Sequence, residues 1–275
     1  MSLSTPPSLT LTPFDIAHAA MEADPENDAL RLALFSRLAD TELFILLEAE
    51  PVGEAIIPQT FETEEGDFIL AFDQEERLSA FAQGPVPYAA LPGRVIAQSL
   101  IGENTGLGIN LDVAQSAMLL PPEALEWLAN TLTHQPEPEE ARITAFHAPA
   151  LPPAILASLM PAFDAKFETL RGLATHALLA GVTYEGGRRG HVLAILGAHE
   201  SSEAGLAKAM SEALMFSGIE AGELDVIFIS PDDSGADDLL AKALVLVIPE
   251  REEETAQIVE HKAPGMDPTK PPILR

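Results

Sequence analysis

Residues Leu173–Ala198, LATHALLAGVTYEGGRRGHVLAILGA, decide how we interpret the fold. The runs Leu173–Glu185 and Gly190–Ala198 each have the length and apolar content of a buried strand. Between them, the adjacent Gly186 and Gly187 can supply the positive φ angles that a tight turn requires. The stretch therefore predicts a long β-hairpin.

The segments on either side of this hairpin alternate between strand and helix patterns. Arg142–His147 and Leu224–Ser230 are typical of strands, whereas Pro152–Asp164 and Glu203–Phe216 are typical of helices. The resulting order, β-α-β-β-α-β, predicts a ferredoxin-like domain in which helices cover one face of an antiparallel sheet. An additional helix at Ala236–Ala241 and an additional strand at Ala243–Ile248 extend this domain.

The first half of the chain contains a second set of elements. Thr12-Pro13-Phe14-Asp15 is a typical helix start, with a hydroxyl cap, an N-terminal proline and an acid in the first turn, and Asp24-Pro25-Glu26 repeats it. Leu43–Leu47 and Asp67–Phe72 predict buried strands, and Asp73-Gln74-Glu75-Glu76 is a capping box that opens another helix. The remaining expected elements are helices from Pro92 and from Pro122 and short strands at Gly106–Leu111 and Ser116–Leu120.

A proline-rich, acidic segment, His134–Glu140, separates the two sets and has no apolar period, so it predicts a linker. We therefore expect an α+β protein of two domains, at residues 1–135 and 141–250. Residues 251–275 form an acidic and proline-rich tail in this interpretation.

The charge of the chain restricts its partners. There are 43 acidic and 15 Lys or Arg residues, which gives a formal net charge of −28. Such a surface repels phosphate backbones and anionic lipids, so we expect neither nucleic-acid nor membrane binding. It favours a neutral or basic protein partner.

Composition also restricts the chemistry and the compartment. The chain has no cysteine, which excludes disulfides, thiolate metal sites and cysteine nucleophiles. The first thirty residues contain no lysine or arginine, and no apolar run reaches the ~20 residues of a membrane helix. We therefore expect a cytoplasmic protein.

The seven histidines suggest a metal site, but their spacing does not support one. A two- or four-residue hairpin turn would place His176, Tyr184 and His191 on one face of the sheet. No zinc-type ligand spacing accompanies these histidines, so we interpret them as buried or half-buried side chains held by hydrogen bonds.

Other candidate motifs also have structural explanations. The acidic run Asp232–Asp238 lacks the spacing of a calcium loop, and Asp233 or Ser234 is expected to cap the following helix. Gly102, Gly106 and Gly108 fit no phosphate-binding loop, and no G-x-S-x-G motif is present. The sequence therefore predicts no catalytic residue, no metal site and no cofactor.

Arg94 is unusual for its electrostatic position. Between Leu38 and Ala141, the only Lys or Arg residues are Arg77 and Arg94. Arg94 falls in the first turn of its expected helix, where the helix dipole disfavours a cation, so we expect a carboxylate nearby. Two interpretations follow: an internal salt bridge that ties helix to sheet, which we favour, or an anchor for an anionic ligand or a partner.

Several stretches resemble the SseB family of enhanced serine sensitivity proteins. The N-terminal domain is similar through Ile69–Phe72, Glu75–Arg77, Tyr88–Gly93, Gly106–Asn110 and Leu119–Pro121. The hairpin and Glu223–Phe228 are similar to the second domain of that family, so the resemblance covers about residues 25–132 and 142–248. Family members often have Asn-Pro-Gly where this chain has Asn110-Leu111-Asp112. The resemblance implies no catalytic residue.

Two functional hypotheses follow. The first is a non-enzymatic protein-interaction or regulatory module, with Arg94, Tyr88 and His191 as candidate anchors for a ligand or a partner. The second is a small-molecule-binding protein or an enzyme linked to amino-acid metabolism, in particular that of serine, which rests on the family name alone. The sequence leaves the partner and the oligomeric state open.

Overall fold

The computed structural model describes residues 11–51, 56–64, 66–136, 140–218 and 224–251, and the expected tail lies outside this range except for its first residue. The helices in this range are α1 (Pro13–Ala23), α2 (Asp28–Asp40), α3 (Glu75–Ala82), α4 (Gly93–Ser99), α5 (Pro122–Thr133), α6 (Pro153–Thr169), α7 (Glu200–Phe216) and α8 (Ala236–Leu240). The strands are β1 (Glu42–Leu46), β2 (Thr60–Thr63), β3 (Gly66–Phe72), β4 (Tyr88–Pro92), β5 (Thr105–Ile109), β6 (Met118–Leu120), β7 (Ile143–His147), β8 (His176–Tyr184), β9 (Arg189–Leu196), β10 (Leu224–Ile229) and β11 (Leu244–Val247).

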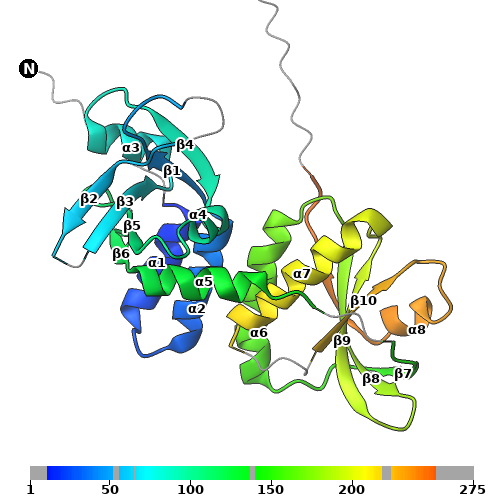
Figure 1. Cartoon of the computed structure of the whole chain (residues 1–275). Coiled ribbons are helices and arrows are strands. Elements are labelled where there is room, and N and C mark those ends of the chain that lie inside the picture. The colour runs from blue at the N-terminus through cyan, green and yellow to red at the C-terminus, as the bar shows by residue number, and fades with distance from the viewer. Residues whose placement is uncertain (1–10, 52–55, 65, 137–139, 219–223, 252–275) are drawn as a thin grey trace, which may run out of the picture.

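The fold is α+β, with two mixed sheets that are consistent with two domains (Figure 1). The first sheet has the order β4-β1-β3-β5-β6, and β2 pairs with β3 outside this path. One apolar core lies between this sheet and α1, α2, α4 and α5, and a smaller core under α3 covers the opposite face. The domain boundaries themselves stay a prediction.

The second sheet has the order β10-β9-β8-β11, and β7 pairs with β8 outside this path. Helices α6 and α7 cover one face, and α8 covers part of the other. The ferredoxin-like strand order that the sequence predicted is wrong. In that arrangement another strand separates the two strands of each βαβ unit, whereas here β9 and β10 are joined through α7 and pair directly in parallel. The order of elements along a chain allows both pairings.

The β8–β9 hairpin is confirmed, and Gly186 and Gly187 have φ angles of +88° and +87°. The expected face of His191 is wrong, however. The N–H of Tyr184 donates to the carbonyl of Arg188, so three residues form the turn instead of two or four. A change of one residue reverses every side chain of a strand, and His191 lies opposite Gly181, on the other face from His176 and Tyr184.

Three helix starts differ from the caps that the sequence predicted. Helix α2 begins after Asn27 rather than at Asp24-Pro25-Glu26, because the Asn27 side chain accepts from the N–H of Ala29. Helix α3 follows Gln74 without a capping hydrogen bond, since Asp73 is occupied elsewhere. Helix α8 follows Gly235, so neither Asp233 nor Ser234 is its cap. The capping box of Thr12 and Asp15 at α1 is present as expected.

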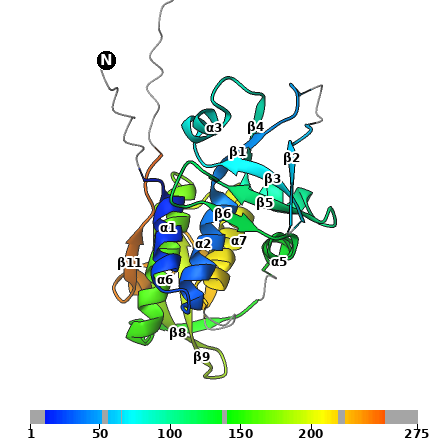
Figure 2. The same cartoon turned by 90° about the vertical axis from the view of Figure 1, so that its left-hand side faces the viewer.

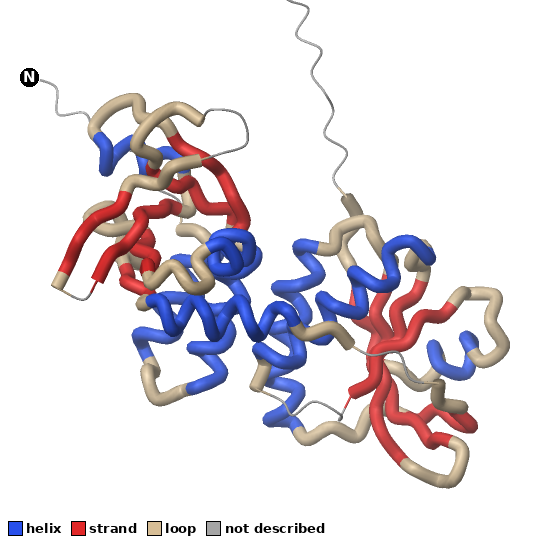
Figure 3. The backbone as a smooth tube through the Cα atoms, in the orientation of Figure 1, coloured by secondary structure: helices blue, strands red, loops and turns tan. Residues whose placement is uncertain are grey.

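Helices of both domains meet between the two sheets (Figure 3). Helix α2 of the first domain contacts α6 and α7 of the second, and these helices lie side by side in Figure 2. Phe216, at the end of α7, is 2% exposed and belongs to the core of the first domain. Among the described residues, no helix has both the length and the apolar character needed to cross a membrane.

Candidate functional site

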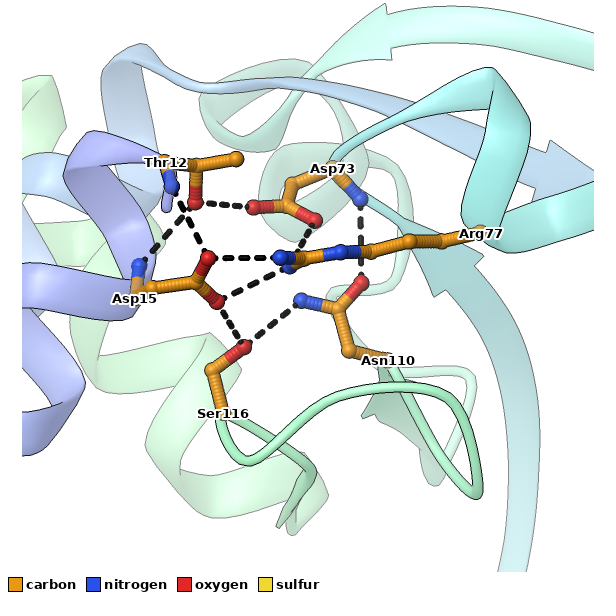
Figure 4. Close-up of polar contacts among 6 residues, drawn as sticks. All are labelled: Thr12, Asp15, Asp73, Arg77, Asn110 and Ser116. Atoms are coloured by element: carbon orange, nitrogen blue, oxygen red, sulfur yellow. Dashed lines mark hydrogen bonds and ion pairs between the residues drawn. The ribbon is translucent and has the colours of Figure 1, made fainter. Parts of the chain in front are cut away.

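The densest polar network lies inside the first domain (Figure 4). The guanidinium of Arg77 binds Asp15 at 2.5 and 2.9 Å and Asp73 at 2.7 Å, and all three side chains are buried. The Thr12 hydroxyl donates to Asp73 at 2.5 Å and accepts from the N–H of Asp15 at 3.0 Å. The network therefore ties the start of α1 to the segment between β3 and α3.

Two further side chains extend this network to the loop after β5. Ser116 donates to Asp15 at 2.5 Å, and the amide of Asn110 donates to Ser116 at 3.0 Å. The side-chain oxygen of Asn110 accepts from the N–H of Asp73 at 3.2 Å, while its φ of +52° is one that asparagine tolerates better than most residues.

The electrostatics of this network are structural. Burial alone raises the pKa of Asp15, but hydrogen bonds from Arg77, Ser116 and the Thr12 backbone outweigh it and hold the pKa well below its usual range. The carboxylate is therefore a permanently charged partner of a buried cation rather than an acid or base that exchanges protons. We interpret the network as a structural one that stabilises the first domain.

A second, partly buried cluster, which we call the interdomain clamp, joins the two domains. It consists of Asp40 on α2, Arg94 on α4, Lys166 on α6 and Glu212 on α7. Arg94 binds both carboxylate oxygens of Glu212 at 3.0 Å and also pairs with Asp40. Lys166 Nζ lies 2.6 Å from Asp40 and 2.8 Å from Glu212, so two cations and two carboxylates alternate.

Two of the four side chains of the clamp are almost completely removed from water. The side chains of Lys166 and Glu212 are 2% and 4% exposed, and that of Arg94 is 33% exposed. Burial alone raises the pKa of Glu212, but Arg94 and Lys166 together hold it below its ordinary value of 4.5. Beside the clamp, Phe216 packs edge-on against Trp127 of α5 with ring centroids 6.3 Å apart. Charge balance and this aromatic contact together fix the orientation of α6 and α7 against the first domain.

A groove of about 660 Å³ lies where the two domains meet, and we call it the acidic groove. The first domain contributes the segment around the start of α2, with Asp24, Glu26 and Asp28 at the rim. The second domain contributes residues of the first turns of α6 and those that follow α7. Leu32 from one domain and Ile155 from the other give the groove apolar surface.

The chemistry of the acidic groove suits a cationic side chain with an aliphatic stem. Lysine and arginine bury their methylene groups on apolar surface while their charged ends stay near water. Of the rim acids, Asp28 already pairs with Arg31, whereas Glu26 has no ion-pair partner within the described part of the chain. The rim therefore keeps a negative potential that attracts a cation.

The three anchor residues expected from the sequence lie in separate places. Arg94 is in the interdomain clamp; the expected salt bridge is present, although its partners are on helices rather than on a sheet. Tyr88 begins the edge strand β4, packs edge-on against Phe44, and has its pKa raised by the charge of Glu75. His191 is half-buried in β9 and its Nε2 accepts from the N–H of Ala150 at 3.3 Å. A ligand or partner role for these residues stays a prediction.

The sequence interpretation missed Lys166, Glu212 and Asp40. A signal for Lys166 was available, because it falls on the helical stripe of Leu159, Phe163 and Phe167, all of which are buried. A charged residue on such a stripe needs a buried partner. The identity of that partner was not accessible, since Asp40 and Lys166 are separated by 126 positions in the chain.

Searches of protein-family models, curated proteins and solved structures found no match to this chain. Within the described residues, no group of three or more histidine, aspartate or glutamate side chains is arranged to hold a metal ion.

Proposed function

We propose that this chain is a non-enzymatic, cytoplasmic protein-interaction module of the SseB-like type, and that it binds a basic segment of a partner protein in the acidic groove. The proposal rests on the way in which the two domains form this groove. Its walls come from two domains, and the partly buried interdomain clamp holds those domains in one orientation. A binding surface that is preorganised in this way loses little entropy on association.

Charge supports the same partner chemistry. With a net charge of −28, the protein attracts positively charged partners over a long range and repels acidic ones. In the groove, the stem of a lysine or arginine can pack on Leu32 and Ile155 while its charged end lies near Asp24 or Glu26. Long-range attraction and local fit therefore favour the same ligand.

A peptide-binding experiment tests the groove directly. The probe is a short labelled peptide of alternating lysine and leucine, and its counterpart alternates glutamate and leucine. We expect the wild-type chain to bind the first and not the second. Asp24→Asn with Glu26→Gln should weaken binding about tenfold, because exposed charge pairs contribute roughly 0–1 kcal/mol each and 1.4 kcal/mol is tenfold.

A matched control separates the groove from general charge. Glu62→Gln with Glu64→Gln removes the same net charge at exposed positions in and next to β2, outside the groove. This variant should change the affinity less than threefold. Equal losses in both double variants would refute the acidic groove as the binding site.

A pull-down from the native host then tests the partner itself. The full wild-type chain and the Asp24→Asn, Glu26→Gln variant serve as baits in low and in moderate salt. We expect a basic or neutral protein that the wild-type chain retains and the variant loses. The proposal is wrong if repeated experiments recover the same proteins on both baits.

A further inference from the structure

The second domain contains another groove, of about 650 Å³, at the turn end of the β8–β9 hairpin. We call it the hairpin groove. Residues from β7, β8, β9 and β10, from the segment after β7 and from the first turn of α6 line it. It belongs to one domain only, so it does not depend on the interdomain clamp.

The charge of the hairpin groove is opposite to that of the molecule. Its lining includes Arg188, Arg189, His147 and His191, and Asp225 is the one acid among the described residues that line it. Two of the 15 Lys and Arg residues of a chain with 43 acidic residues therefore line one groove. Asp225 can neutralise at most one of them.

Arg188 is held in position by its neighbours. Its guanidinium carbon lies 3.9 Å from the centre of the Tyr184 ring, and its Nη2 lies 3.8 Å from Asp225. The Tyr184 hydroxyl donates a hydrogen bond to the same carboxylate. Stacking on an aromatic face fixes the plane of a guanidinium and leaves its N–H groups available for a further acceptor.

Arg189 differs from Arg188 because its guanidinium has no ion-pair or hydrogen-bond partner among the residues that the structure describes. Its side chain is exposed at the start of β9. Its position opposite Thr183 places Arg189 on the same face of the sheet as His191, where an unpaired guanidinium can meet a planar oxyanion. Arg188, by contrast, lies on the other face with Tyr184.

The floor of the hairpin groove is backbone and apolar surface. Gly181 lies under the segment after β7, and a Cβ there would come within 3.0 Å of the carbonyl oxygen of Ala148. Leu151 and Ile155 supply apolar side chains. The Nε2 of His191 accepts from the N–H of Ala150, so this side chain adds a polar edge to the groove.

We propose that the hairpin groove binds a small soluble organic anion, in which a carboxylate or phosphate group meets Arg189 and a short apolar body lies on Leu151. The size of the groove falls in the range of small-molecule sites, and the combination of apolar lining with a few charged groups is typical of them. This inference is independent of the acidic groove and of the partner proposed for it.

The test is a titration of the full isotope-labelled chain followed by amide NMR. Hexanoate and hexyl phosphate are the probes, and hexylammonium has the same apolar body with the opposite charge. We expect saturable shifts at the amides of Gly181 and Gly190 with at least one anion and none there with hexylammonium. The inference is overturned if neither anion shifts these amides, or if hexylammonium shifts them equally.

Variants assign the effect to named side chains. Arg189→Gln should weaken the bound anion about tenfold, because a charge-assisted contact is lost from an exposed residue that no fold contact requires. Arg171→Gln removes an arginine elsewhere in the same domain, whose side chain is 38% exposed, and should leave the affinity unchanged. Equal losses in these two variants would assign binding to general charge and refute the site.

Two further measurements distinguish a soluble ligand from a lipid, and the hairpin groove from the acidic groove. Binding only to anionic lipid vesicles, with no response to either soluble anion, would overturn a soluble ligand. The Asp24→Asn, Glu26→Gln variant should bind the anion as the wild-type chain does, so the failure of one groove leaves the other intact. A loss of anion binding in that variant would contradict the independence of the two sites.

Discussion

Removing one charge from the interdomain clamp should destabilise the protein far more than removing a charge from its surface. Glu212→Gln keeps the shape of the side chain but leaves Arg94 and Lys166 with one carboxylate, that of Asp40. Lys166→Met creates the opposite imbalance. The double variant restores neutrality, because Arg94 and Asp40 remain as a pair.

The magnitude follows from burial and geometry. Glu212 accepts three hydrogen bonds, at 3.0, 3.0 and 2.8 Å, and its side chain is 4% exposed. Breaking a buried ion pair by removing one partner costs about 3–5 kcal/mol. Since Arg94 is 33% exposed and partly screened by water, we expect each single variant to lower the free energy of unfolding by about 3 kcal/mol. The double variant should cost about 2 kcal/mol less than the sum, which is typical of coupling within one network.

Urea unfolding, followed by far-ultraviolet circular dichroism and by fluorescence, measures these changes. The chain has one tryptophan, Trp127, and it packs against Phe216 of the other domain, so its emission reports the domain contact. The control is Glu168→Gln on the same helix as Lys166. Its carboxylate pairs with Arg171 at the surface, where side-chain exposures are 38% and 52%, and its loss should cost less than about 1 kcal/mol.

Additivity would refute this reasoning. If Glu212→Gln and Lys166→Met each cost less than about 1 kcal/mol, and their effects add to within about 0.5 kcal/mol, the two residues are not coupled. The clamp would then contribute no more than a surface pair, and the fixed orientation of the acidic groove would lose its physical basis.

Three further predictions concern the clamp, the Arg77 network and the hairpin turn. Folding lowers the pKa of Glu212. The charged Glu212 side chain therefore stabilises the fold fully above its ordinary pKa of 4.5, and this stabilisation is lost as the pH falls through the folded-state pKa. In acid unfolding curves, the stability difference between wild type and Glu212→Gln should therefore shrink below pH 4.5. Arg77→Met strands two buried carboxylates and should cost about 3–5 kcal/mol in urea unfolding, whereas Arg31→Gln at an exposed pair should stay within about 0.5 kcal/mol. Gly187→Ala should cost about 1 kcal/mol in thermal unfolding because φ is +87°, whereas Gly205→Ala, in open space on α7, should gain about 0.5–1 kcal/mol; a gain at Gly187 would contradict the turn geometry.

Local chemistry made much of the fold predictable. The adjacent glycines identified the hairpin because few other residues adopt positive φ angles at low cost. Thr12, Pro13 and Asp15 identified the start of α1 because a cap acts within one turn. Helix α5 was expected from Pro122, with Leu125 and Leu128 on its buried face. In each case the deciding interaction lies within a few residues of the chain.

The predictions were wrong where a residue distant in the sequence determines the local structure. Asp73 has the spacing of a capping box, but a buried guanidinium competes for its carboxylate. The face of His191 depended on one residue in the turn length, which glycine content alone does not specify. The sheet order of the second domain depended on which strand pairs with β10, and an element order leaves that choice open. Strand β4, an edge strand with alternating burial, was not predicted at all.

The candidate sites were less predictable than the fold for the same reason. Arg94 was found because a cation in a first helical turn violates a local rule, and its need for a carboxylate followed. Its bidentate partner, Glu212, is 118 positions away, and no local pattern identifies it. Neither groove could be expected in detail, since each is lined by elements that meet only in three dimensions.

The two grooves meet at the first turn of α6, where Ile155 lines both of them. The same helix carries Lys166, so the clamp that fixes the two domains also fixes the element that the grooves share. A change in the orientation of α6 relative to α2 alters the acidic groove, because its opposite wall belongs to the other domain. The hairpin groove keeps its walls under the same change, because β8, β9, β10 and α6 all belong to the second domain. The acidic groove should therefore depend on the state of the clamp, whereas the hairpin groove should persist whenever the second domain is folded.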